Sequence, residues 1–165
     1  MSVMPDIHFL PVEPVLTLHP GDVACVERGQ RLETLLGSCV AIVLTDPRRT
    51  VGAMCHIVHT GRATEGVVET GAYGGVALDT MYMLLRERGI DPRQCVAYVY
   101  GGGNMFPKLL RGGGRHVGDR NACWALEALA HDGVQVLFHD LGGAAYRRLS
   151  WTVGPEAPQV TAVPV

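Results

Sequence analysis

A cysteine and a histidine in two neighbouring apolar segments are the residues of this sequence best suited to covalent chemistry. Cys39 follows Gly37 and Ser38 at the start of an apolar run, and His56 lies 17 residues later in a second run. A turn at residues 46–49 would fold the two runs into a hairpin and bring both side chains together. A histidine beside a cysteine lowers the thiol pKa and later protonates the leaving group. The pattern therefore indicates nucleophilic catalysis, and a buried structural cysteine is the alternative that spacing alone leaves open.

The same region contains three side chains of the types that bind zinc, namely Cys55, His56 and His59. Successive side chains of a strand point to opposite faces, so His56 would point away from both other residues. Cys55 and His59 would share a face, but four residues of strand separate them by roughly 13 Å. We therefore expect no metal site here, and no cofactor is expected from the rest of the sequence.

Two glycine-rich loops resemble nucleotide-binding loops only in part. The first, YVYGGGNMF at residues 98–106, has Phe106 where the dinucleotide fingerprint requires a glycine. The second, residues 111–121, precedes a predicted helix, where an anion could bind. Tight turns with positive φ are the simpler explanation for both loops. The residues of the second loop that would meet an anion are Arg115, Gly118 and Arg120.

The composition is typical of a folded domain close to electrical neutrality. The 165 residues include 14 basic and 16 acidic side chains, so no basic surface field is expected and nucleic acid is not an expected partner. A hydrophobic fraction of 47% with 18% charged residues excludes intrinsic disorder. Five cysteines without a C-x-x-C pair argue against a disulfide framework. The sequence starts without a signal peptide and contains no uncharged stretch of the ~20 residues that span a bilayer. We therefore expect a cytoplasmic protein without membrane insertion.

Strands dominate the expected secondary structure, and two helices come late in the chain. Apolar residues at helical spacing predict helices over residues 73–88 and 121–132, each followed by a glycine. Because most strands are joined by hairpins, we expect an α+β fold with a mostly antiparallel sheet system. Residues 15–165 would form one domain, preceded by an N-terminal arm at residues 1–14. The expected strands are residues 15–18, 22–26, 40–44, 51–58, 95–100, 134–139, 146–153 and 159–163.

Several ordered motifs extend over about residues 15–153. Residues 34–44, TLLGSCVAIVL, are followed by GAMCH at residues 52–56. The later motifs are YVYGGGNMF at residues 98–106, VGDRN at 117–121 and DLGG at 140–143. With these motifs the sequence resembles the CheD family of chemoreceptor glutamine deamidases.

The resemblance implies a fold and a reaction. The fold is an α/β/β layered sandwich with mostly antiparallel sheets and two main helices on one face, related to toxin deamidases of the cytotoxic necrotizing factor type. The reaction converts Gln side chains in helices of methyl-accepting chemotaxis receptors to Glu, with release of ammonia. The protein would then be a protein-glutamine glutaminase that depends on a cysteine and a histidine.

The resemblance also implies roles for individual residues. Cys39 is the nucleophile, His56 is the general base and acid, and a threonine upstream of the cysteine orients the histidine. In some members that threonine lies six residues before the cysteine, where this chain has Glu33. We assign the orienting role to Thr34, one residue later, because a threonine hydroxyl can hydrogen-bond an imidazole. Glu33 is the alternative, since a carboxylate beside the histidine would hold it and raise its pKa.

The implied partners are receptor helices, as the substrate, and a CheC-type phosphatase, which family members engage. A non-catalytic adaptor that binds receptors or such a phosphatase is the alternative function. Loss of Cys39 or His56 would have favoured the adaptor, and both residues are present. A module that binds anions through its arginines is a third, weaker hypothesis.

Overall fold

The computed structural model describes residues 14–64, 66–68, 70–109 and 116–165. The N-terminal arm expected at residues 1–14 lies outside the described residues, except for its last position. Within the described residues the elements are, in chain order, β1 (Leu16–Leu18), β2 (Val23–Glu27), β3 (Arg31–Leu36), β4 (Val40–Thr45), β5 (Val51–Ile57), α1 (Gly74–Glu87), the short 3-10 helix η1 (Pro92–Gln94), β6 (Val96–Gly101), α2 (Val117–His131), β7 (Gln135–Leu141), β8 (Ala145–Thr152) and β9 (Gln159–Pro164).

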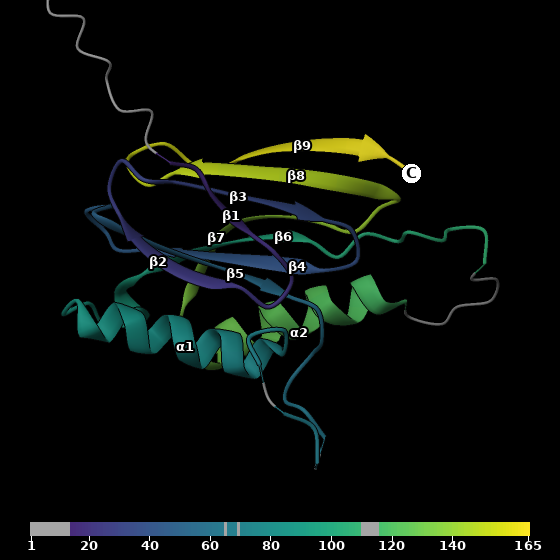
Figure 1. The fold of residues 1–165 in the computed structure, drawn as a ribbon, viewed down its shortest axis with the longest axis horizontal. Helices are drawn as coiled ribbons and strands as arrows, with labels where there is room; N and C mark the ends of the chain where they lie inside the picture. The colour runs from purple at the N-terminus through teal and green to yellow at the C-terminus, as the bar shows by residue number, and fades with distance from the viewer. Residues whose placement is uncertain (1–13, 65, 69, 110–115) are drawn as a thin grey trace, which may run out of the picture.

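These elements form three layers, two of them β-sheets and the third a pair of helices (Figure 1). The four-stranded sheet has the order β1-β3-β8-β9, and the five-stranded sheet has the order β2-β5-β4-β6-β7. Helix α1 packs against β2 and β5, and α2 packs against β4, β6 and β7, so both helices cover the same face of the five-stranded sheet. The β1–β3 and β6–β7 pairs are parallel, and the other pairs are antiparallel. The expected α+β, α/β/β layered fold is confirmed.

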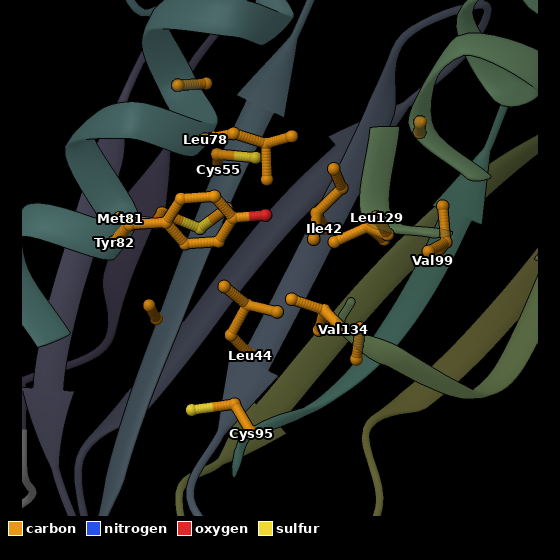
Figure 2. Packing of buried hydrophobic residues seen from close by; sticks show 14 of the residues in the cluster. Ile42, Leu44, Cys55, Leu78, Met81, Tyr82, Cys95, Val99, Leu129 and Val134 are labelled. Carbon is orange, nitrogen blue, oxygen red and sulfur yellow. The ribbon is translucent and has the colours of Figure 1, made fainter. Parts of the chain in front are cut away.

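The five-stranded sheet is covered on both faces, by the helices on one side and by the four-stranded sheet on the other. Every residue of β4 and β5 is buried as a result. Ile42 and Cys55 belong to the cluster against the helices, where Figure 2 shows Cys55 beside Leu78. Ala41 and Met54 belong to the cluster between the two sheets. Burial on both faces explains why these two segments are continuous apolar runs in the sequence.

Strand β3 was missing from the strands expected from the sequence. Its apolar residues Leu32 and Leu36 are buried between the sheets, together with Thr34, whereas Arg31 lies on the exposed outer face. This alternation is normal for a strand with one solvent-facing side. The charged residues interrupt the apolar run that we used as a strand signal, so the segment escaped prediction. The consequence is functional, because β3 aims Thr34 into the layer between the sheets.

Helix α2 begins at Val117, four residues before the start expected from the sequence. The His116 side chain caps this end by accepting a hydrogen bond from the Asp119 N–H at 3.2 Å. Gly118, which we took as part of a loop, lies in the first helical turn. A Cβ atom at this position would lie 2.4 Å from the carbonyl oxygens of Gly102 and Gly103. The glycine therefore serves close packing of the helix on the glycine loop that follows β6.

Replacing Gly118 by alanine should lower the free energy of unfolding by about 1–3 kcal/mol, because the added methyl group is forced against two backbone carbonyls. The direction of the change in stability is informative, because helix propensity alone would make the alanine variant more stable by about 1 kcal/mol. Urea unfolding followed by circular dichroism measures the change. Met83→Ala, at a half-exposed position of α1, should change the value by less than about 0.5 kcal/mol. A Gly118→Ala protein as stable as the wild type would contradict the close contact.

Candidate active site

The β4–β5 hairpin carries the predicted cysteine and histidine to one end of the five-stranded sheet. His56 pairs with Ala41 across the ladder, and Cys39 lies two residues before Ala41 at the entry to β4. Cys39 and His56 are therefore diagonal neighbours on the same face, with strand positions about 7–8 Å apart. Cys39 packs, partly buried, against the cluster between the sheets, and His56 is 3% exposed. The hairpin expected from the sequence thus places both side chains in the layer between the two sheets.

A threonine on the opposite sheet holds the histidine. The Thr34 hydroxyl lies 2.8 Å from His56 Nδ1 and 2.8 Å from the Leu18 carbonyl oxygen. A hydroxyl has one hydrogen to donate, and the carbonyl can only accept it. The hydroxyl therefore accepts from His56, which places the proton of the neutral imidazole on Nδ1. His56 Nε2 is left with a free lone pair, as a general base requires.

Glu33, the alternative partner for the histidine, points to the other face of β3. Its carboxylate lies 3.0 Å from the Arg31 guanidinium and accepts a hydrogen bond of 3.5 Å from the Ser150 hydroxyl. These contacts lie on the outer side of the four-stranded sheet, because neighbouring side chains of a strand point in opposite directions. Of the two candidates, the one in contact with His56 is Thr34.

Burial shifts the pKa values of both Cys39 and His56 toward the uncharged form of each group. Burial raises the pKa of the Cys39 thiol above its ordinary value of 9.0. Burial also lowers the pKa of His56 below 6.5, an effect that the Asp22 carboxylate opposes only in part. Both shifts favour the uncharged form of a group removed from water. The direction for Cys39 is opposite to the lowered thiol pKa expected from the sequence, because that expectation took no account of desolvation.

Gly37, Ser38 and Cys39 lead into β4, and each of their carbonyl groups is held by a hydrogen bond. Among the described residues, no hydrogen-bond acceptor is found for their N–H groups. In a trans peptide the N–H points away from the preceding carbonyl, so the fixed carbonyls also fix the directions of the Ser38 and Cys39 N–H groups. Two N–H groups with fixed directions beside a nucleophile are candidates for stabilising an oxyanion. The carbonyls of residues 37, 38 and 39 accept, in that order, from the Gly103 N–H at 2.9 Å, the Asn121 side chain at 3.0 Å and the Gly102 N–H at 2.9 Å.

The glycine loop after β6 must be free of side chains to make these contacts. Gly101 has a φ of +111°, and a Cβ atom there would lie 2.2 Å from the Cys39 carbonyl oxygen. The simple explanation from the sequence, a loop with positive φ, therefore holds for this loop. The structure adds that the loop supports the backbone on either side of Cys39.

An apolar pocket of about 360 Å³ opens beside this segment. Ser38 lies on one side of the pocket, and the start of α2 lies on another. Phe106 and Leu109 are 66% and 76% exposed, which is unusual for large apolar side chains. The pocket thus offers apolar side chains that suit the apolar side of a protein segment, and His116 and Arg120 also line it. Its apolar side chains come from Met105, Phe106, Leu109 and Val117.

The three potential zinc ligands point in different directions. Cys55 lies in the core against the helices (Figure 2), where burial raises its pKa to about 12. His56 lies on the opposite face of β5. His59 follows the end of the strand, and its ring centroid lies 4.9 Å from that of Tyr73. For the anion site considered above, Arg115 lies outside the described residues.

Comparison with known proteins identifies the family of this chain. A sequence model described as CheD chemotactic sensory transduction matches residues 59–156. A relative from Albidiferax ferrireducens is 38% identical over 138 residues, which cover 82% of this chain and 80% of the relative. The chain belongs to the CheD family. The relative carries the name "Probable chemoreceptor glutamine deamidase CheD 2".

Two further members show the same extent of similarity to this CheD-family chain. A protein of Pseudomonas fluorescens is 35% identical over 133 residues, covering 80% of this chain and 75% of its own. A protein of Chromobacterium violaceum is 35% identical over 150 residues, covering 87% of this chain and 76% of its own. Both are named as probable chemoreceptor glutamine deamidases.

In the part of the chain that the structure describes, neither helix has the length and apolar character needed to cross a membrane.

Asn121 is the residue of this site that the sequence analysis missed. It is 2% exposed, and its side-chain amide donates to the carbonyls of Ser38 and Val58. We had noted it only as part of the helix-start motif VGDRN. A stronger signal was present, because Asn121 lies three and four residues from Gly118 and Ala125 on the buried stripe of α2. A polar residue on the buried stripe of a helix needs partners, and here they are the two segments that carry Cys39 and His56.

Replacing Thr34 by valine should remove the preference of His56 for the tautomer with its proton on Nδ1. The methyl group that replaces the hydroxyl cannot accept a hydrogen bond from Nδ1–H. In the wild type, imidazole nitrogen shifts at about pH 7.5 should show a protonated Nδ1 and a bare Nε2. Titration of the same signals should give a pKa below 6.5. Thr34→Ser keeps the hydroxyl and should preserve the pattern, whereas Thr34→Val should give a mixture of tautomers. A wild-type proton on Nε2 would contradict the hydrogen-bond assignment.

Proposed function

We propose that this protein is a chemoreceptor glutamine deamidase in which Cys39 attacks the substrate and His56 transfers the protons. The observation that carries the proposal is the hydrogen bond from His56 Nδ1 to the Thr34 hydroxyl, which leaves Nε2 free on the face shared with Cys39. The names of the relatives supply the substrate class, a Gln side chain of a chemoreceptor.

The reaction starts from the neutral pair. As Cys39 Sγ bonds to the side-chain carbonyl carbon of the substrate Gln, its proton moves to His56 Nε2. The carbonyl oxygen becomes an oxyanion, which the N–H groups of Ser38 and Cys39 are placed to stabilise. His56 then gives the proton to the amide nitrogen, the carbon–nitrogen bond breaks, and ammonia leaves. A thioester between Cys39 and the substrate side chain remains.

The second half-reaction uses water. His56 Nε2 takes a proton from the water as its oxygen attacks the thioester carbon. The carbon–sulfur bond then breaks, the Cys39 sulfur recovers the proton from His56, and the product is Glu. Water is consumed and ammonia is released, with no change in oxidation state. Each cycle adds one negative charge to the receptor segment and creates a methyl-accepting side chain.

Thr34 assists by orientation. Its hydroxyl accepts a hydrogen bond from Nδ1–H and donates one to the Leu18 carbonyl. These two bonds hold the position of Nδ1 and the orientation of the imidazole ring. An imidazolium formed during the reaction keeps the same hydrogen bond. The uncharged threonine leaves the imidazole a weak enough base to give its proton to the departing amide nitrogen, whereas a carboxylate would raise the histidine pKa.

The apolar pocket beside Ser38 fits a helix of a receptor. Residues three and four positions from a Gln on such a helix lie on its side of the helix, and apolar residues at those positions would meet the exposed side chains of Phe106 and Leu109. Binding would cover these apolar side chains and exclude water from the reacting carbonyl.

Cys39→Ala and His56→Ala should each abolish most conversion of Gln to Glu, because one removes the nucleophile and the other leaves ammonia without a proton donor. His59→Ala should retain most activity, since His59 lies beyond the end of β5 against Tyr73. Intact-mass spectrometry of purified receptor fragments measures the gain of about one dalton per site. Binding of the fragment without any mass change by the folded wild type would favour the non-catalytic adaptor instead. Full activity of a folded Cys39→Ala protein would exclude Cys39 as the nucleophile.

The pH dependence distinguishes a neutral pair from a preformed ion pair. With a neutral pair, kcat/KM should fall on the acid side as His56 becomes protonated, with a midpoint below 6.5. It should stay level from about pH 7 to 8.5, because His56 is already neutral and the Cys39 pKa is raised. A thiolate–imidazolium pair would instead lose activity in that alkaline range as the imidazolium deprotonates. Stopped assays on one receptor fragment across this range decide between them.

A further inference from the structure

Asn121 connects two main-chain segments at the point where the β4–β5 ladder ends. Its side-chain nitrogen donates to the Ser38 carbonyl at 3.0 Å and to the Val58 carbonyl at 3.2 Å. The ladder between β4 and β5 reaches only to the pair Val40 and Ile57. Beyond that pair the two chains separate, and the Val58 N–H bonds to the Ala72 carbonyl instead. The asparagine therefore replaces the next rung of the ladder.

The two carbonyls flank the proposed reacting groups. Ser38 directly precedes Cys39, and Val58 follows His56 by two residues. Because the peptide between Ser38 and Cys39 is planar and trans, holding the Ser38 carbonyl also sets the direction of the Cys39 N–H. One side chain thus sets the distance between the two strand ends and the aim of one proposed oxyanion donor.

Asparagine is suited to this position because its amide nitrogen carries two hydrogens, one for each carbonyl. Both donors are engaged by the main chain, so the nitrogen is not itself available to an oxyanion. A carboxylate of the same shape would bring an acceptor against two acceptors. The side chain is 2% exposed.

We propose that Asn121 is a positioning residue for the deamidation reaction, holding the Cys39 and His56 segments at their working separation through Ser38 and Val58. The inference rests on the proposed function, since the readout is turnover. It goes beyond that function by assigning a role to a helix residue that touches neither the substrate nor the reacting atoms.

The test compares Asn121→Asp and Asn121→Ser with Thr45→Val. Thr45 is also fully buried and donates to a main-chain carbonyl, that of Val51 at 2.8 Å, but at the other end of β4. Thr45→Val thus removes a bond of the same kind away from the site. Asn121→Ser is smaller and keeps one donor, so it provides a folded variant if the aspartate is not tolerated. Thermal unfolding and steady-state kinetics on one receptor fragment are measured for all four proteins.

Asn121→Asp should lower kcat about 100-fold, the size of effect seen when reacting groups are slightly misplaced, while KM changes less than about threefold. Asn121→Ser should show a smaller loss of kcat. Thr45→Val should lose stability but keep kcat close to that of the wild type. The positioning role is wrong if folded Asn121 variants keep wild-type kcat, or if Thr45→Val loses kcat to the same degree for the same loss of stability. Absence of turnover by the wild type would overturn the proposed function itself, a distinct outcome.

Discussion

The hydrogen bond between Thr34 and His56 joins two different sheets, and the site depends on it. Thr34 belongs to the four-stranded sheet and His56 to the five-stranded sheet. The bond forms only if the two sheets pack face to face with these positions opposite each other. The large side chains of the layer between the sheets, among them Leu36 and Trp151, set that packing. The tautomer of His56 therefore depends on how the two sheets pack against each other.

Desolvation is the second constraint, and it determines the chemistry that the pair can perform. His56 is buried and Cys39 partly buried in the layer between the sheets, so charge on either group is disfavoured before substrate arrives. A neutral pair is less reactive toward solutes in general than a free thiolate. In the proposed mechanism charge develops only when a carbonyl is in place to accept the sulfur and donors are in place to receive the oxyanion. Such a site favours selectivity over indiscriminate reactivity.

The sequence predicted the parts of the fold and site that depend on local pattern. The apolar runs around Cys39 and His56 predicted the hairpin, because both faces of those strands are buried. Strand β3 was missed because its outer face is charged, although Thr34 lies on it and the resemblance to a family had singled that residue out. The direction of the Cys39 pKa shift and the contacts of Asn121 both depend on burial. Burial is a property of the packed layers, and no spacing in the sequence specifies it.

The contacts that complete the site are distant along the chain. The hydrogen bond from Asn121 to Ser38 spans 83 residues, and folds that depend on contacts of such separation form more slowly than folds built from local contacts. During synthesis, Cys39 and His56 emerge well before α2. A growing chain therefore holds its proposed nucleophile and base before the helix that we propose to position them. The hydrogen bonds that join the Ser38 and Val58 carbonyls are therefore complete only after α2 has been made and has packed against the sheet.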